Sequence, residues 1–179
     1  LVFLDFYEEM MDVDSIISDS FYGAFTITNY LISKGHRDIG FIGNIYATNS
    51  ILDRYLGYQK ALLINKIPLR DQWVISDRGE DGKYIDIVLP KEMPKAFVCN
   101  CDSVAYIFIN KLKKVGYKVP DDISIVGYDN DIFATLSIPK LTTIEVNTQT
   151  MAETAITSLM GKIQGEHRSL GRKVIGGNL

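Results

Sequence analysis

The stretch V-P-D-D-I-S-I-V-G-Y-D-N-D, residues 119–131, decides the fold class of this chain. Pro120 and the two aspartates after it form a turn. Ile123 to Val126 then form a short apolar run rich in β-branched residues, the pattern of a strand buried on both faces. Asp129 and Asp131 follow directly. Ligands bind beyond the carboxyl ends of strands in open α/β sheets, so these carboxylates indicate a binding site, although a core strand followed by a solvated loop has the same pattern.

The rest of the chain alternates short apolar runs with segments of helical periodicity. Further strands are predicted at Val2–Phe6, Ile39–Ile42, Trp73–Ile75, Ala96–Cys99, Leu141–Val146 and Arg172–Ile175, whereas Ile16 and Ile17 form only a short apolar piece. Helices are predicted from Asp19 or Ser20 to Gly35 and at about 50–66, 84–89, 102–115 and 148–164. Because the connections are too long for hairpins, this order predicts right-handed βαβ units and an α/β fold whose parallel sheet carries helices on both faces.

The bulk composition is that of an ordinary globular protein and excludes two classes of partner. The 179 residues are 46% hydrophobic and 23% charged, with a formal net charge of −3. That balance offers no basic surface for nucleic acid, and no apolar run approaches the roughly 20 residues needed to span a bilayer. The start has neither a Met nor a secretory signal, and a buried-looking strand at residue 1 indicates a piece of a longer protein. Cys99 and Cys101, expected as free thiols, fit a reducing compartment.

Motifs for catalysis and cofactor binding are missing from the sequence. It contains no G-x-x-x-x-G-K-[ST], G-x-G-x-x-G or G-x-S-x-G, and His36 and His167 lie far from any nucleophile or metal-ligand cluster. We therefore predict no catalytic residue, metal or cofactor. The one enzyme alternative uses Asp5 and Asp129 at strand ends to bind Mg²⁺ for phosphoryl transfer, in loose similarity to the haloacid-dehalogenase-type phosphatases. Tyr7 occupies the position of that family's second Asp, which removes its general acid.

Arg54 is the strongest candidate for binding a polar ligand. It lies one turn into the helix predicted from residue 50, after a strand end and a polar loop, and Ser50 shares its helix face. A planar guanidinium presents five donors that match sugar hydroxyls or a carboxylate, and Asp129 would supply acceptors for the same groups. The alternative is a surface arginine paired with Asp53 or Glu8.

Six motifs follow one another along the chain. They are V-F-L-D (2–5), D-S-I-I-S-D followed by G-A (14–24), L-I-x-x-G-H-R-x-I (31–39), R-x-x-G-Y-x-x-A-L (54–62), V-P-D-D-I-S-I-V-G-Y-D (119–129) and P-x-L-T-T-I (139–144). Each motif alone is a weak signal. Together, in this order and spacing, they resemble the effector-binding region of the LacI/GalR family of bacterial transcription regulators.

The resemblance implies a fold similar to the type I periplasmic binding proteins, with two lobes of which the N-terminal one is incomplete. Residues 1–17 and about 146–165 would belong to the N-terminal lobe. Residues of about 18–145 and 166–179 would form the C-terminal lobe. The DNA-binding head of such regulators would lie outside these 179 residues.

By the same resemblance, a ligand held between the lobes would face Asp5, Ser50, Arg54, Cys101 and Asp129. Cys101 stands where the family has Asn, and a thiol cannot replace the donors and acceptor of an amide. Tyr46, Trp73 and Phe133 are candidates for an apolar ligand face by residue type alone.

The implied function is ligand sensing without catalysis, in a cytoplasmic regulator. A sugar-like effector would shift the equilibrium between lobe arrangements and so change the affinity for operator DNA. The implied partners are this effector, operator DNA through the N-terminal head only, and a second copy of the chain through the C-terminal lobe, with the helix after Asp102 and residues 132–138 as the candidate interface. No membrane is implied. An exported sugar-binding protein of a transporter, which shares the fold, is the alternative.

Overall fold

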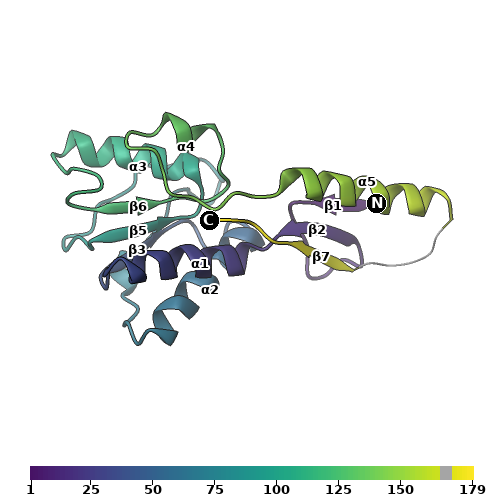
Figure 1. The fold of residues 1–179 in the computed structure, drawn as a ribbon, viewed down its shortest axis with the longest axis horizontal. Coiled ribbons are helices and arrows are strands. Elements are labelled where there is room, and N and C mark those ends of the chain that lie inside the picture. The colour runs from purple at the N-terminus through teal and green to yellow at the C-terminus, as the bar shows by residue number, and fades with distance from the viewer. Residues whose placement is uncertain (166–170) are drawn as a thin grey trace.

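The computed structural model describes residues 1–165 and 171–179 and consists of two α/β units of unequal size, joined by three crossings of the chain (Figure 1). The smaller unit contains β1 (Val2–Leu4), β2 (Asp14–Ser18), α5 (Thr148–Ile163) and β7 (Arg172–Ile175). The larger unit contains α1 (Ser20–Ser33), β3 (Ile39–Ile42), α2 (Asn49–Ile64), a 3₁₀ turn (Asp71–Trp73), β4 (Val74–Ile75), β5 (Ala96–Cys99), α3 (Asp102–Lys114), β6 (Ser124–Val126) and α4 (Ile132–Leu136). Both sheets are wholly parallel, in the orders β1-β2-β7 and β4-β3-β5-β6, which confirms the predicted α/β class.

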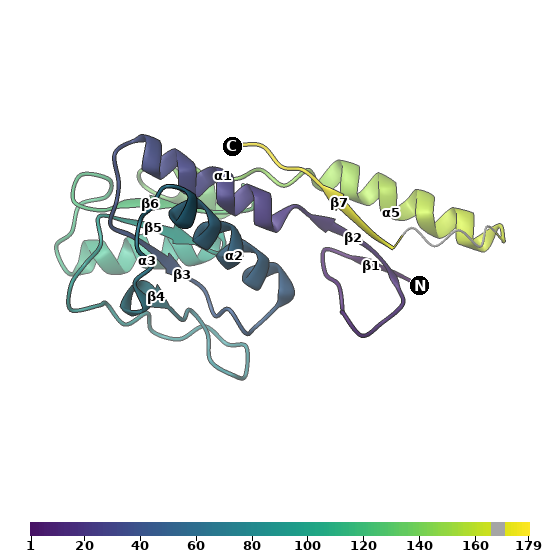
Figure 2. The same ribbon diagram turned by 90° about the horizontal axis from the view of Figure 1, so that it is seen from below.

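The larger unit covers its sheet on both faces. α1 and α2 lie against one face and α3 against the other (Figure 2), and every residue of β3 and β5 is buried between them. The two helices on the first face approach closely at Gly57, where any Cβ would collide with the carbonyl oxygen of Phe21. Among the described residues, no helix is long and apolar enough to cross a membrane.

Local signals set the ends of the long helices close to where the sequence predicts them. The Asp19 carboxylate caps α1 by accepting a hydrogen bond from the Tyr22 amide at 2.9 Å. Gly35, with φ at +96°, follows its last turn in the left-handed conformation that favours glycine. α2, α3 and α5 likewise lie within two residues of their predicted bounds.

The smaller unit is built around β2, all five residues of which are buried. The sequence predicts only a short apolar piece here, because Asp14, Ser15 and Ser18 interrupt the hydrophobic pattern. The Asp14 carboxylate is held inside the unit: Oδ1 accepts from the Gly171 amide at 2.8 Å, and Oδ2 lies 2.9 Å from the Lys162 ammonium. α5 packs against β1 and β2, while β7 is largely exposed.

Hydrogen bonds tie the three crossings together. The Asp19 amide, at the first crossing, donates to the Ile175 carbonyl at 2.8 Å. Glu145, at the second, exchanges two backbone hydrogen bonds with Asn178, at 2.7 and 3.1 Å. A Cβ on Gly177 would come within 2.6 Å of the Glu145 carbonyl oxygen, so the close approach of the second and third crossings depends on glycine.

The predicted division of the chain needs one correction. It assigns residues 166–179 to the same lobe as residues 18–145, but all four residues of β7 pair with β2 in the smaller unit. The buried strand β2 needs hydrogen-bond partners on both edges, and β1 can supply only one of them. Residues 166–170 of that assignment, His167 included, lie outside the described residues.

Two further local predictions are wrong. Residues 84–89 form no helix, because Tyr84 bridges to Arg78 and the Ile85 amide donates to the Asp77 carbonyl, which binds this segment to the preceding loop. The strand predicted at Leu141–Val146 is not formed. Isolated bridges occur there instead, between Thr142 and Val126 at the end of β6 and between Glu145 and Asp129 just after it.

Candidate functional site

A cavity of about 570 Å³ lies where the end of β1 meets the larger unit. Its lining comes from both units and from the second crossing: Asp5, Phe6, Thr48, Ser50, Ile51, Arg54, Arg78, Asn100, Cys101, Asp129, Asn130, Asp131, Glu145, Val146 and Thr148. Sites for small molecules generally measure about 300–1,000 Å³. Most of the lining residues have hydrogen-bonding side chains, and these include both positively and negatively charged groups. Such a lining suits a ligand rich in hydroxyl groups.

Arg54 is fixed at the centre of this lining. Its side chain comes from α2 and is nearly buried, with the residue 7% exposed. Nε donates to Ser20 Oγ at 3.3 Å, Nη1 to the Asn100 carbonyl at 2.6 Å, and Nη2 to Asp129 Oδ1 at 3.2 Å. The guanidinium also lies 3.9 Å from the centre of the Tyr128 ring. These contacts engage three of the five donor hydrogens of the guanidinium and leave one on each terminal nitrogen.

The alternative partners of Arg54 are engaged elsewhere or absent from its contacts. Asp53 accepts a hydrogen bond from the Tyr7 hydroxyl at 3.0 Å instead. Glu8 is exposed, and the three hydrogen bonds of the guanidinium go to Ser20, Asn100 and Asp129 instead. Arg54 is therefore a buried, cavity-lining arginine and not a surface one.

Asp129 is delivered to the cavity by an unusual backbone. It follows β6 with φ at +106°, in the left-handed region that L residues rarely adopt. Burial raises the pKa of its carboxyl to about 6, although the Arg54 guanidinium acts in the opposite direction. At neutral pH the group is mainly ionised, so it accepts hydrogen bonds from Arg54 and can accept more from a ligand.

Asp102 holds this part of the site together from behind. It is fully buried, and it accepts hydrogen bonds from Thr143 Oγ1 at 2.7 Å and from the Asp131 amide at 3.0 Å. Burial raises its pKa to about 6. A Cβ on Gly127 would collide with Oδ1 of Asp102, so the end of β6 can pass this carboxylate only as glycine. Asp102 thus positions the loop that carries Asp129 and Asp131.

Cys101 lies at the N-terminal end of α3, where its side chain forms no cap to the helix. Its Sγ is 3.2 Å from Ser103 Oγ. Burial raises the pKa of the thiol, which keeps it protonated at neutral pH. Cys99 and Cys101 are both free thiols. In the cavity, Cys101 offers a weak donor and a soft surface where an amide would offer strong hydrogen bonds.

The structure brings the five main predicted residues to one cavity, since Asp5, Ser50, Arg54, Cys101 and Asp129 all line it. It does not bring the three predicted aromatics there. Trp73 is buried and donates to the Glu92 carbonyl at 2.8 Å, and Phe133 packs against Tyr106 at 5.4 Å. Tyr46 is 91% exposed and lines a neighbouring cavity.

The aromatic side chain in the lining is that of Phe6, which stacks on Phe3 at 4.4 Å. It comes from the loop that follows β1, so the smaller unit supplies the aromatic face of the site. The sequence gives no reason to prefer Phe6 over the other aromatics, because only the fold places the end of β1 against the larger unit.

Arg78 and Asp77 are functional candidates that the sequence does not single out. Nε and Nη2 of Arg78 donate to Asp77 Oδ2 at 3.0 and 2.8 Å, which directs the guanidinium to the edge of the cavity. Asp77 is 1% exposed and also accepts from Asn100 Nδ2 at 3.1 Å and from the Asn44 amide at 2.7 Å. These partners lie far apart in the sequence, which leaves no local signal.

The cavity lining includes several carboxylates but no evident metal centre. Within residues 1–165 and 171–179, no group of three or more His, Cys, Asp or Glu side chains is arranged to hold a metal ion. The Asp5 and Asp129 carboxylates, which the phosphatase alternative uses, both line the cavity.

Residues 28–179 match the family model of the periplasmic binding protein-like domain. The chain is 37% identical over 154 residues to the HTH-type transcriptional repressor PurR of Pectobacterium carotovorum, an alignment that covers 84% of this chain and 45% of that protein. The chain thus spans about half the length of the curated relatives it matches.

Two solved structures show the same fold. A complex of the transcriptional regulator CelR with cellobiose superposes with a TM-score of 0.84 at 22% identity, over 99% of this chain and 56% of that one. A LacI family transcriptional regulator from Enterococcus faecium with bound ribose superposes with a TM-score of 0.81 at 22% identity, over 99% of this chain and 66% of that one.

Proposed function

The chain belongs to the periplasmic binding protein-like domain family, as the effector-binding region of a LacI-family transcriptional regulator, and on this premise we propose that its 570 Å³ cavity binds a sugar or sugar derivative that changes operator affinity. The observation that carries the proposal is the fixed guanidinium of Arg54. A buried arginine that lines a polar cavity and has three of its five donor hydrogens engaged keeps two for the hydroxyl or carbonyl oxygens of a ligand. The relatives with bound cellobiose and ribose support a sugar as the first class to test.

The two units correspond to the two lobes in this proposal. Asp5 and Phe6 reach the cavity from the smaller unit, while Arg54 and Asp129 reach it from the larger one. A ligand that contacts both sets is bound best in one relative arrangement of the units, so its binding shifts the equilibrium toward that arrangement. This requires neither catalysis nor a cofactor.

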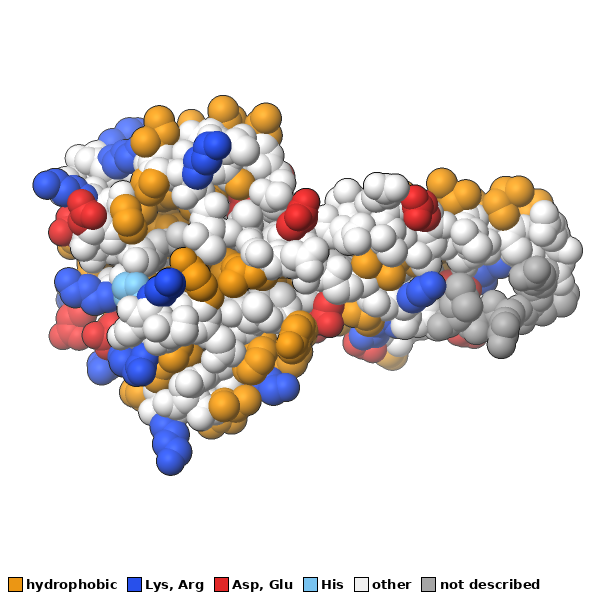
Figure 3. Space-filling model, in the orientation of Figure 1, with side chains coloured by type: hydrophobic (Ala, Val, Ile, Leu, Met, Phe, Trp, Pro, Cys, Tyr) orange, Lys and Arg blue, Asp and Glu red, His pale blue; other side chains and the backbone are white. Residues whose placement is uncertain are grey.

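We propose that a second copy of the chain binds to the larger unit, at a surface formed by α3, α4 and the residues just after α4. Four apolar side chains are exposed on α3, on α4 and just after it: Ile107, Ile132, Leu136 and Ile138. Hydrophobic side chains also gather along the upper edge of the larger unit in Figure 3, over α4. An exposed apolar patch of this kind is typical of a protein interface.

Operator DNA would be bound through a separate helix-turn-helix head and not through these residues. The formal net charge of −3 gives the chain no general attraction for phosphates. Two heads in a dimer would contact half-sites about one helical turn apart, and a change in lobe arrangement would alter their spacing. The similarity to repressors favours this cytoplasmic role over that of an exported sugar-binding protein.

A thermal-shift screen against neutral sugars, sugar phosphates and nucleobases tests the proposal. A ligand at 100 times its dissociation constant should stabilise the protein by about 2.7 kcal/mol. Arg54→Ala should abolish that shift because it removes the oriented donors. Arg54→Lys keeps the charge but not the planar fork and should weaken binding strongly. Arg70→Ala is the matched control, since Arg70 lies over the Trp73 ring away from the cavity. Undiminished affinity in Arg54→Ala would contradict the assignment of the site.

A further inference from the structure

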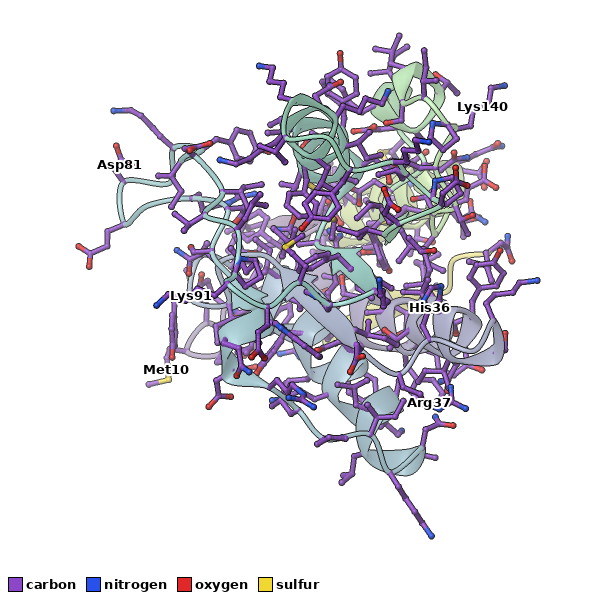
Figure 4. The ribbon with its side chains drawn as sticks, turned by 90° about the vertical axis from the view of Figure 1, so that its left-hand side faces the viewer. Met10, His36, Arg37, Asp81, Lys91 and Lys140 are labelled. Carbon is purple, nitrogen blue, oxygen red and sulfur yellow. The ribbon has the colours of Figure 1, made fainter. Side chains whose placement is uncertain are left out.

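A second cavity, of about 650 Å³, lies beside the first and shares Arg78 with it. Its lining comes from two loops of the larger unit, beyond the carboxyl ends of β3 and β4: Asn44, Tyr46, Ala47, Ser76, Arg78, Gly79, Glu80 and Gly82. Figure 4 shows Asp81 at the tip of the second loop, which stands out from the body of the larger unit. The two loops therefore form walls that extend the site outward from the first cavity.

Hydrogen bonds connect these walls and fix their shape. The Asn44 amide donates to Asp77 Oδ1 at 2.7 Å, and Asn44 Nδ2 donates to the Arg78 carbonyl at 3.1 Å. Ser76 Oγ donates to the same carbonyl at 2.8 Å. The Tyr46 amide donates to Asn44 Oδ1 at 3.0 Å, which fixes the backbone that carries the exposed ring. A cavity whose loops are cross-linked in this way exists before any ligand arrives.

Arg78 stands at the junction of the two cavities with donors to spare. Asp77 engages its Nε and Nη2, and the guanidinium lies 5.0 Å from the centre of the Tyr84 ring. Both hydrogens on Nη1, which makes no hydrogen bond within the described part of the chain, remain for a ligand. A ligand oxygen between the cavities would meet these donors.

Tyr46 supplies the one large apolar surface of the second cavity. Its side chain is 91% exposed although its backbone is held. An aromatic ring contributes hydrophobic stabilisation only when something covers it. Around it, Asn44, Ser76 and Glu80 offer polar groups. An apolar ring face surrounded by hydrogen-bonding groups matches a pyranose ring, which has hydroxyls at its edge and C–H groups on its faces.

We propose that the two cavities form one two-part site, and that the effector is a sugar of two linked rings, with the first ring bound at Arg54, the linkage near Arg78 and the second ring against Tyr46. This inference rests on the proposed function, because it takes the first cavity to bind a sugar. The predicted role of Tyr46 as an apolar ligand face is thereby kept, but in the second cavity.

Titration calorimetry with matched pairs of sugars tests the inference: glucose with cellobiose, glucose with maltose, and galactose with lactose. For one pair at least, the disaccharide should bind ten-fold or more tightly than its monosaccharide. Tyr46→Ala should reduce that ratio to about two-fold or less while the affinity for the monosaccharide stays unchanged. Tyr46→Phe keeps the ring face and should retain the ratio. Tyr22→Ala is the matched control, since Tyr22 is an exposed tyrosine on α1 that lines neither cavity.

The outcomes separate the two proposals. If monosaccharides bind in an Arg54-dependent way and no disaccharide binds more tightly, the two-part site is overturned and the proposed function stands. An equal loss of both affinities in Tyr46→Ala would also overturn it, because the ring would then act on the first cavity. If no sugar of either kind binds, the sugar-binding proposal and this inference fail together.

Discussion

The two units of the molecule both pack helices on a parallel sheet but are stabilised very differently. In the larger unit, α1 and α2 cover one face of a four-stranded sheet and α3 covers the other, so that β3 and β5 are entirely buried. In the smaller unit, α5 packs on a three-stranded sheet whose outer strand β7 is largely exposed. The larger unit therefore has the hydrophobic core, and the smaller one depends more on its connections.

This difference separates the rigid part of the site from the adjustable part. Arg54, Asp102 and Asp129 are held by hydrogen bonds within the larger unit. Asp5 and Phe6 reach the cavity from the smaller unit, which is joined to the rest through the three crossings. One wall of the site is thus preorganised, and the other can change position at lower energetic cost.

The largest expected effect is on the free energy of unfolding, when an aromatic residue is removed from one pair in each unit. Phe97 is fully buried and packs edge-on against Phe108 at 4.9 Å. Phe97→Ala should lower the free energy of unfolding by about 3–5 kcal/mol, because it removes buried contacts and leaves a cavity. Phe6 is 48% exposed on its stack with Phe3. Phe6→Ala should cost only about 1 kcal/mol. Denaturant unfolding measures both, and equal losses would refute the proposed imbalance between the units.

An intermediate effect is expected at the seam where the crossings meet. Gly177→Ala would place a Cβ 2.6 Å from the Glu145 carbonyl oxygen and 3.0 Å from Ile144 Cγ2, so a backbone segment must move. We expect a loss of about 1–3 kcal/mol in the free energy of unfolding. The neighbouring Gly176→Ala is the matched control, because its Cβ would meet no atom within 4 Å. If both variants unfold alike, the close approach of the crossings does not hold the units together.

The same contrast explains which features could be predicted from the sequence. The long helices of the larger unit carry local signals, such as the cap at Asp19 and the stop at Gly35, and they were predictable to within a few residues. β2 was not, because its polar residue Asp14 is satisfied by Gly171, 157 positions away, which no local pattern reveals. The interior of a strand with distant polar partners looks like a loop in the sequence.

The residues of the candidate site also differ in whether a local sequence signal identifies them. Arg54, Ser50 and Asp129 belong to motifs that place them at strand or helix ends, and all three line the cavity. The role of Arg78 in the site could not be predicted from the sequence, because its orientation depends on a hydrogen bond to Asp77. Asp77 is itself held by Asn44 and Asn100, which lie far away in the sequence. Residue type alone also failed for Trp73, which is buried in the larger unit.

The smallest effect we predict is a pH dependence that arises in the larger unit, from Asp102. Burial raises the pKa of this carboxyl from 3.8 to about 6, so the folded chain binds more protons than the unfolded chain between these values. The resulting contribution to stability is complete below the unfolded pKa and is lost as the pH rises through 6. Lowering the pH from about 7 to about 5 should therefore raise the free energy of unfolding by about 1 kcal/mol from this group.

Asp102→Asn isolates that contribution, because an amide cannot ionise and still fits the hydrogen bonds at this position. Its oxygen can accept from the Asp131 amide, and its Nδ2 can donate to the Thr143 hydroxyl, which is able to act as an acceptor. The variant should lose about 1 kcal/mol of the increase in stability between pH 7 and pH 5. Asp86→Asn, at an exposed carboxylate paired with Lys111, controls for the loss of one negative charge. An unchanged pH dependence in Asp102→Asn would mean that Asp102 does not supply the acid-linked stability, which would then have to come from other groups, such as the buried Asp129 in the same wall of the site.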